Sequence, residues 1–278
     1  MMWRWVAATL ALCGVLTGCA GYGALPAART TPADTLRVMT YNIFAGNDLD
    51  RHSNLVRVAA LIDSLRADVV FLQEVDRRTA RSGGVDQAGV LAERTGMQAV
   101  FGRAMEFDGG EYGIAVLSRR PIRSSRVVPL EVARPSELTA RPYEPRALLH
   151  VVIDTRAGQL HLLNTHLDHQ GDPVFRHPQV LQLLAYAADS VPRGAATVLG
   201  GDLNAVPEAT EVRALGVAFD DAWTRCGSGA GPTFRADRPV RRIDYILLAG
   251  TRCVAARIID TLLSDHRPLV VDLLLGGG

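Results

Sequence analysis

Short apolar runs alternate with polar stretches from residue 36 onward. Runs of this length that contain many β-branched residues are typical of buried strands. They are LRVMTYNIF (36–44), ADVVFLQEV (67–75), IAVLS (114–118), ALLHVVI (147–153), LHLLNTHL (160–167), TVLGGDLN (197–204), RIDYILL (242–248) and PLVVDLLL (268–275).

Three segments between these runs have the 3.6-residue period of amphipathic helices. Residues 54–65 place Leu55, Val58, Ile62 and Leu65 on one face, and residues 85–95 and 180–188 repeat the pattern. Many strands with a few helices between them predict an α/β sandwich of two packed sheets.

Several predicted strands end in polar side chains at the point where the apolar run stops. Asn42, Glu74, the segment 164–168, Asp202 and Asn204 all occupy such positions. Each residue alone has an ordinary explanation as a strand end or a turn. Four instances in one chain indicate a site that a rigid scaffold presents at the ends of its strands.

The N-terminal segment predicts a secretory signal with a lipidated cysteine. Arg4 precedes an apolar stretch, and the ending Leu-Thr-Gly-Cys at Cys19 resembles a bacterial lipobox. We therefore expect a lipoprotein signal peptide over 1–18, a lipidated Cys19 with a flexible tether over 19–35, and one catalytic domain over 36–275. The alternatives are a short membrane helix, or a plain signal peptide that leaves a soluble protein.

A lipidated Cys19 implies an extracytoplasmic protein that is anchored to a bacterial membrane. Because Ala20 and not Asp follows the cysteine, the membrane would be the outer one in a Gram-negative host. Beyond the signal, Cys226 and Cys253 remain, and in an oxidising compartment they either pair or stay as buried thiols.

The overall charge argues against strong bulk binding of nucleic acid. The formal net charge is +1, whereas non-specific nucleic-acid binders carry a basic excess. The chain contains no internal repeat and no second linker, and we expect a monomer. A hydrophobic content of 48% is sufficient for a sizeable core.

The polar residues at the strand ends are oxygen ligands and imidazoles. Carboxylate and amide oxygens suit a hard cation such as Mg²⁺, with Mn²⁺ as a substitute. Imidazoles suit proton transfer or stabilisation of developing negative charge. Together they predict metal-assisted attack of water on a phosphoester.

Read in order, seven segments resemble the motif series of the endonuclease/exonuclease/phosphatase superfamily, which includes deoxyribonuclease I. The segments are TYNI, LQEV, EYGIAVLSRRPI, NTHL, GDLN, RIDYI and SDHRPL, and they extend over residues 36–275. The resemblance implies a four-layered α/β sandwich, with two packed mixed β-sheets flanked by helices and the site at the sheet edges.

The resemblance also implies a role for each matching residue. Metal binding falls to Asn42, Glu74 and Asp265. Catalysis falls to His166, which faces the phosphate, Asp202, which activates water, Asn204, which contacts the phosphate, and Asp244, which holds His266.

Two further positions are predicted with alternatives. Glu111 lies where deoxyribonuclease-like members place a Glu that partners the first His, although other branches differ there. Arg146 either contacts the phosphate of the substrate or forms a structural ion pair. The polar loop 76–87 either lines the substrate entrance or is merely solvated.

The expected activity is that of a metal-dependent phosphoester hydrolase, most simply a phosphodiesterase, tethered to a membrane. Its substrate class stays open between nucleic acid, a lipid headgroup or glycosylphosphatidylinositol-related diester, and a small phosphomonoester or nucleotide. A non-catalytic binding lipoprotein that keeps the fold is the alternative from another class.

Overall fold

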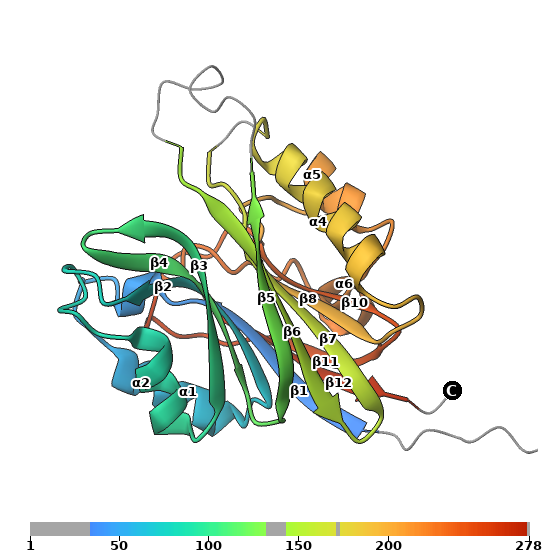
Figure 1. The fold of residues 1–278 in the computed structure, drawn as a ribbon, viewed down its shortest axis with the longest axis horizontal. Coiled ribbons are helices and arrows are strands. Elements are labelled where there is room, and N and C mark those ends of the chain that lie inside the picture. Colours follow the sequence, from blue (N-terminus) through green and yellow to red (C-terminus); the bar gives the residue numbers. More distant parts are fainter. Residues whose placement is uncertain (1–33, 132–142, 171–172, 277–278) are drawn as a thin grey trace, which may run out of the picture. The chain divides into compact units, whose positions relative to one another are not determined.

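Two six-stranded sheets form the centre of the computed structural model, which describes residues 34–131, 143–170 and 173–276 (Figure 1). The first sheet has the order β11 (Arg252–Ile258), β12 (Leu269–Leu275), β1 (Asp34–Asn42), β2 (Val69–Arg77), β4 (Gly110–Ser118) and β3 (Gln98–Phe107). The second has the order β5 (Ile122–Leu130), β6 (Arg146–Thr155), β7 (Gly158–His166), β8 (Thr197–Asp202), β10 (Asp244–Ala249) and β9 (Asp220–Asp221).

Helices cover the outer faces of both sheets. Figure 1 shows α1 (Leu55–Leu65) and α2 (Gln87–Thr95) beside the first sheet, and α4 (Arg176–Ser190) with α5 (Thr210–Leu215) beside the second. The short elements are η1 (Phe44–Gly46) and α6 (Ala222–Cys226). The resulting order of helix, sheet, sheet and helix confirms the predicted four-layered sandwich.

Three apolar clusters fill the spaces between these four layers. One lies between the two sheets and includes Phe71, Leu162 and Ile246. The second joins α1 and α2 to the first sheet, and the third joins α4 and α5 to the second. Each fully buried aliphatic or aromatic side chain contributes about 1.5–3 kcal/mol, so these clusters supply most of the driving force for folding.

The two sheets pack tightly where a glycine of β8 faces an aromatic ring of β2. A Cβ atom on Gly200 would lie 2.2 Å from Cδ2 of Phe71, a distance that no real contact allows. Gly200 in TVLGGDLN is therefore needed for the packing of β8 against β2, and this packing sets where the strand ends that carry the site lie relative to each other.

The register of the strands brings the polar strand ends together. In the first sheet, β1 and β2 are parallel and Asn42 pairs with Gln73. In the second sheet, Asp202 pairs with His166 on the parallel strand β7 and with Asp244 on the antiparallel strand β10. Residues that are far apart in the sequence thus reach one edge of the sandwich.

The structure contains strands that the apolar pattern does not predict. The largest are β3, β5 and β11, which are edge or near-edge strands with mixed or exposed side chains. Strands of this kind lack a continuous apolar run and often carry charged side chains that discourage edge pairing. β5 illustrates this, with Arg123 and Arg126 exposed.

Cys226 and Cys253 are joined by a disulfide that connects α6 to β11, with their Cα atoms 6.0 Å apart. This decides between the two alternatives that the sequence leaves open. The predicted signal peptide, Cys19 and most of the predicted tether lie outside the described residues. No helix in the described part of the chain is long and apolar enough to cross a membrane.

Candidate active site

A cavity of about 860 Å³ opens where the strand ends of the two sheets meet. It brings together seven of the predicted site residues from segments that are far apart in the chain. These are Glu74, Arg146, His166, Asp202, Asn204, Asp265 and His266. Asn42 and Asp244 are fully buried and lie behind this wall, in hydrogen-bond contact with it.

Asn42 connects the two sheets at the base of the cavity. Its Nδ2 donates to Oε1 of Glu74 at 3.0 Å and to Oδ2 of Asp202 at 3.1 Å, while its Oδ1 accepts the backbone N–H of Phe44 at 3.1 Å. Because both carboxylates receive the amide NH₂, Asn42 orients Glu74 and Asp202. Its predicted role as a metal ligand would depend on the remaining lone pair of Oδ1.

Glu74 lies at a β-bulge that turns its side chain towards the cavity. The register between β2 and β4 shifts between Leu72 and Val75, and Glu74 has a φ of 54°, which non-glycine residues rarely adopt. Burial raises the pKa of Glu74, and the hydrogen bond from Asn42 partly offsets this shift. Such backbone strain is typical of functional sites.

Asp202 is the central carboxylate of the site. Nε2 of His166 lies 3.5 Å from its Oδ2, and Nε2 of His266 lies 3.6 Å from the same oxygen. The backbone N–H of Asn204 donates to Oδ1 at 2.9 Å. Burial raises the pKa of Asp202 to about 7, against the opposing effect of the charge on His266. This carboxylate is therefore able to exchange a proton near neutral pH.

His266 forms a buried pair with Asp244. Its Nδ1 lies 2.8 Å from Oδ2 of Asp244. Burial alone lowers the pKa of His266, but the carboxylates of Asp244 and Asp202 outweigh it and raise the pKa to about 10. His266 is thus a cation at neutral pH, and its Nε2 faces the cavity as a hydrogen-bond donor.

The motif SDHRPL is anchored to the other end of the sequence. Oγ of Ser264 donates to the backbone carbonyl of Asn42 at 2.7 Å and accepts the backbone N–H of His266 at 3.2 Å. This places Asp265 on the cavity wall, where burial raises its pKa. The Asp-His pair near the C-terminus therefore completes a site that begins at Asn42.

Arg146 lies almost fully buried beside His166. Its Nη1 is 3.0 Å from Oε1 of Glu144 and 3.0 Å from Nδ1 of His166, and its Nη2 is 3.2 Å from Nδ1 of His169. Arg146 therefore forms the predicted ion pair and also lines the cavity, and its contact with a substrate phosphate stays a prediction.

Glu111 is the predicted site residue that the structure does not bring to the cavity. It faces Arg77 across the β2–β4 pair, and its carboxylate forms ion pairs with Arg77 and, at 3.6 Å, with Arg103. The position next to Nδ1 of His166, where a partner carboxylate was expected, is occupied by Arg146. The cross-strand register explains this, because it directs Glu111 to a different surface depression.

The loop 76–87 reaches the cavity through Arg81. Its guanidinium is held by two hydrogen bonds of 2.7 Å to the buried carboxylate of Asp76, and it lies 4.5 Å from the ring centre of Phe107. Arg81 and Phe107 both line the cavity. Arg81 is thus a fixed element of the cavity wall, and the role of this loop at a substrate entrance stays a prediction.

The donor set of the cavity fits a hard divalent cation. Glu74 and Asp265 are carboxylates on the cavity wall, and the charge of Asp265 contributes to the raised pKa of Glu74. Buried carboxylates that are close to each other are costly unless a cation offsets their charge. Oxygen ligands are those that Mg²⁺ and Mn²⁺ prefer.

Asp202, Asp244 and His266 also have potential ligand atoms within 4.8 Å of one another. In this group the protonated imidazole of His266 already lies between the two carboxylates, so it takes the position that a cation would need. Glu74 and Asp265 are therefore the better candidates for holding the metal.

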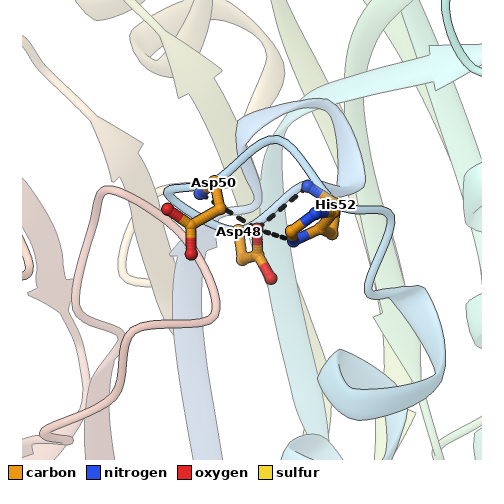
Figure 2. Close-up of side chains that lie close together, drawn as sticks. All are labelled: Asp48, Asp50 and His52. Atoms are coloured by element: carbon orange, nitrogen blue, oxygen red, sulfur yellow. Dashed lines mark hydrogen bonds and ion pairs between the residues drawn. The ribbon is translucent and has the colours of Figure 1, made fainter.

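A second group of potential metal ligands, Asp48, Asp50 and His52, has a structural explanation (Figure 2). Oδ1 of Asp48 accepts the backbone N–H groups of Asp50 at 3.0 Å and His52 at 2.9 Å, and its Oδ2 pairs with Arg57. These bonds use the carboxylate of Asp48 to close the loop that follows η1.

Among the cavity residues that the sequence does not predict as site residues, His169 and Phe234 contact the predicted ones. His169 reaches Arg146, and the ring centre of Phe234 lies 4.8 Å from that of His266. His169 lies three residues after His166 in a histidine-containing loop, which is a weak signal. Phe234 belongs to no motif, and only the tertiary structure places it beside the site.

The sequence profile of the Endonuclease/Exonuclease/phosphatase family matches residues 39–266. The chain therefore belongs to this family, whose members are hydrolases that act on phosphoesters. The match begins just before Asn42 and ends at His266, so it includes the predicted site residues between them.

The chain is also similar to known proteins in sequence and in structure. The chain is 26% identical to the uncharacterized Escherichia coli protein YbhP, over 87% of this chain and 97% of that protein. Its fold is similar to that of an endonuclease/exonuclease/phosphatase from Beutenbergia cavernae, with 28% identity, a TM-score of 0.73, and coverage of 87% of this chain and 72% of that one.

Two solved structures with lower identity share the fold. One is a mannosyl-6-phosphatase from Bacteroides thetaiotaomicron, with 19% identity, a TM-score of 0.68, and coverage of 86% of this chain and 99% of the other. The second is D. rerio TDP2 in complex with single strand DNA product, with 18% identity, a TM-score of 0.65, and coverage of 86% and 98%. The fold is therefore shared with a phosphatase and with a protein whose structure was solved with a DNA product.

Proposed function

We propose that this protein is a divalent-cation-dependent phosphodiesterase in which Asp202 activates the attacking water. The observation that carries the proposal is the position of Oδ2 of Asp202 between two imidazoles, beside the carboxylate of Glu74 that shares Asn42 with it. The groups that this proposal needs as base, as donors to the phosphoryl oxygens and as metal ligands lie around one cavity, which supports it.

Each residue has a role that follows from its protonation and its position. Asp202, with a pKa of about 7, accepts the proton of the water. His266, held as a cation by Asp244, donates a hydrogen bond from Nε2 to the developing negative charge. Asn204, at the end of the GDLN motif, extends its NH₂ into the same region.

Glu74 and Asp265 are the residues that would hold Mg²⁺ or Mn²⁺, with Asn42 orienting Glu74. When bound, the cation offsets negative charge on the phosphoester and polarises its P–O bond. It also lowers the cost of keeping two carboxylates in one buried region.

The proposal is tested by hydrolysis of bis-p-nitrophenyl phosphate with and without Mg²⁺ or Mn²⁺. We expect turnover that EDTA abolishes and that Asp202→Asn lowers by about 10³-fold or more, since it removes the base. The variant Asp50→Asn, in the loop of Figure 2, is the matched control and retains activity. A well-folded protein with no turnover on any phosphoester, at any metal concentration, contradicts the proposal and favours the non-catalytic alternative.

A panel of natural substrate classes would then separate the open alternatives. DNA, RNA, phospholipids, inositol phosphates, sugar phosphates and nucleotides are compared at equal concentration. The net charge of +1 gives no reason to expect strong bulk binding of nucleic acid. A preference for diesters over monoesters would support the proposed diesterase, and the opposite preference would contradict it.

We also propose that the enzyme acts as a monomer outside the cytoplasm, held at a membrane by a lipid on Cys19. The Leu-Thr-Gly-Cys sequence after the apolar N-terminal stretch supports this proposal. Mass spectrometry of the mature N-terminus tests it: a diacylated Cys19 is expected. An unmodified N-terminus at another residue, or a full-length chain that keeps Met1, would contradict it.

A further inference from the structure

His166 is held by a residue that can only donate hydrogen bonds. Nη1 of Arg146 lies 3.0 Å from Nδ1 of His166, and both side chains are buried, with 3% and 5% of their surface exposed. A guanidinium has five donors, no acceptor, and does not lose a proton in proteins. A hydrogen bond between these two nitrogens therefore requires a lone pair on Nδ1.

The arginine is itself fixed in this orientation. The same Nη1 forms an ion pair with Oε1 of Glu144 at 3.0 Å, and Nη2 contacts Nδ1 of His169 at 3.2 Å. Since Nη1 carries two hydrogens, one is directed to Glu144 and the other to His166. Burial and the nearby charge of Arg146 both lower the pKa of His166, which keeps the imidazole neutral.

A second donor competes for the same ring. Nδ2 of Asn204 lies 3.0 Å from Nε2 of His166, and it also lies 3.0 Å from the carbonyl oxygen of Leu167, which identifies it as the NH₂ group. A neutral imidazole has one lone pair on its ring nitrogens and cannot accept from both Arg146 and Asn204.

The charged donor prevails in this competition. Hydrogen bonds in which one partner is charged are stronger than hydrogen bonds between neutral groups. In addition, the carboxylate oxygen Oδ2 of Asp202 lies 3.5 Å from Nε2 and attracts a proton there. Each tautomer places one N–H opposite a donor: the Nε2–H form faces the neutral NH₂ of Asn204, and the Nδ1–H form faces the charged guanidinium of Arg146, each at 3.0 Å. The Nε2–H form keeps the charged donor bonded and also faces the carboxylate of Asp202, so it is the less costly of the two.

We propose that Arg146 is a positioning residue that holds neutral His166 in the tautomer with its proton on Nε2. His166 then donates a hydrogen bond into the cavity, to a phosphoryl oxygen of a bound phosphoester. The substrate part of this inference rests on the proposed function, whereas the assignment of the tautomer does not.

The hydrogen bond at Nδ1 of His166 runs in the opposite direction from the one at Nδ1 of His266. Asp244 accepts from Nδ1 of His266 and stabilises a cation, while Arg146 donates to Nδ1 of His166 and stabilises a neutral ring. Both nevertheless present an N–H at Nε2. The site thus offers two donors on either side of Asp202 while it adds only one positive charge, that of His266, next to the base.

The tautomer is measured directly by long-range ¹H–¹⁵N correlation NMR on protein with ¹⁵N-labelled histidine. The chain has seven histidines, and His166 is assigned by the loss of its signals in His166→Gln. We expect the Nε2–H pattern for His166 in the free protein near neutral pH. An Nδ1–H pattern or an imidazolium pattern for His166 would overturn the proposal.

Variants of Arg146 test whether this residue sets the tautomer of His166 or only stabilises the fold around it. Arg146→Lys keeps a cationic donor and should keep the Nε2–H pattern, with kcat on bis-p-nitrophenyl phosphate within about tenfold of wild type. Arg146→Glu supplies an acceptor and should convert His166 to Nδ1–H, with a loss in kcat of about 10²-fold or more because the oxyanion donor is removed. An Nε2–H pattern that persists in a folded Arg146→Glu protein would overturn the proposal.

Thermal unfolding and circular dichroism confirm that each variant is folded, and the wild-type spectrum decides the tautomer even if a variant fails to fold. Failure of the proposed function has a different signature. An Nε2–H tautomer that Arg146→Glu abolishes, in a protein that hydrolyses no phosphoester, contradicts the proposed activity and supports the positioning role.

Discussion

His166 and His266 approach the same oxygen of Asp202, at 3.5 Å and 3.6 Å, from two different elements of the second half of the chain. His166 ends β7, and His266 lies in the loop before β12. The two rings thus define a base with a donor on each side. Under the proposed function, this carboxylate accepts a proton while the two imidazoles stabilise negative charge on the phosphoester.

The charge of Asp244 controls the pH range over which His266 is a cation. Its carboxylate contributes to raising the pKa of His266 to about 10, so activity that needs the cation is retained below that pH and lost above it. Asp244→Asn removes the charge, and the pKa should fall towards its ordinary value. We expect the basic limb of the kcat/KM profile to move down by at least about one pH unit. If the basic limb of the profile does not move, then the titration of a group other than His266 causes it.

Replacing Glu74, which lines the cavity, should affect activity far more than replacing Glu111, which lies outside it. Glu74→Gln removes a carboxylate that would hold the metal, and we expect a loss of kcat/KM of about 10²-fold or more together with weaker metal binding. Glu111→Gln affects only the ion pairs with Arg77 and Arg103, so activity should stay within about threefold. Kinetics at several Mg²⁺ concentrations measure both effects. A large loss of kcat in folded Glu111→Gln would restore its predicted catalytic role.

The disulfide should stabilise the fold more than it affects the chemistry. It closes a loop across 27 residues and connects α6 to β11, away from the residues that line the cavity. The double variant Cys226→Ser with Cys253→Ser should lose about 2–4 kcal/mol of unfolding free energy. Urea denaturation measures this loss, and kcat at 25 °C should be nearly unchanged. Dithiothreitol should lower the stability of the wild type but not that of the variant.

A buried histidine pair should make the fold sensitive to acid. His150 contacts His161 at 3.0 Å and the hydroxyl of Tyr186 at 3.0 Å, and burial lowers the pKa of His150 to about 4. Because the unfolded chain binds the proton more tightly, stability is present above about pH 6.5 and is lost as the pH falls through 4.

We expect a loss of about 1–2 kcal/mol from this histidine between pH 6.5 and pH 4, after allowance for solvent screening. Urea denaturation across this range measures it. His150→Gln should reduce the slope of stability against pH, since Gln does not titrate. A variant with the same slope as wild type would assign the acid sensitivity to other groups.

The amino-acid sequence alone determines much of the fold and of the site. Apolar runs such as 67–75 and 197–204 are long enough to specify buried strands, and the polar residues at their ends, Glu74 and Asp202 among them, are already recognisable as a set. Local pattern is sufficient here because both sides of these central strands are covered by helices or by the other sheet.

Only the tertiary structure decides how these groups are paired. The strand register sends Glu111 to Arg77 and leaves Arg146 beside His166, and the turn of the chain brings Phe234 next to His266. Such pairings depend on contacts between residues that are distant in the sequence, and no local pattern encodes them. The chemistry of the individual groups can therefore be read from the sequence, but their protonation and their partners follow from the packing of the two sheets.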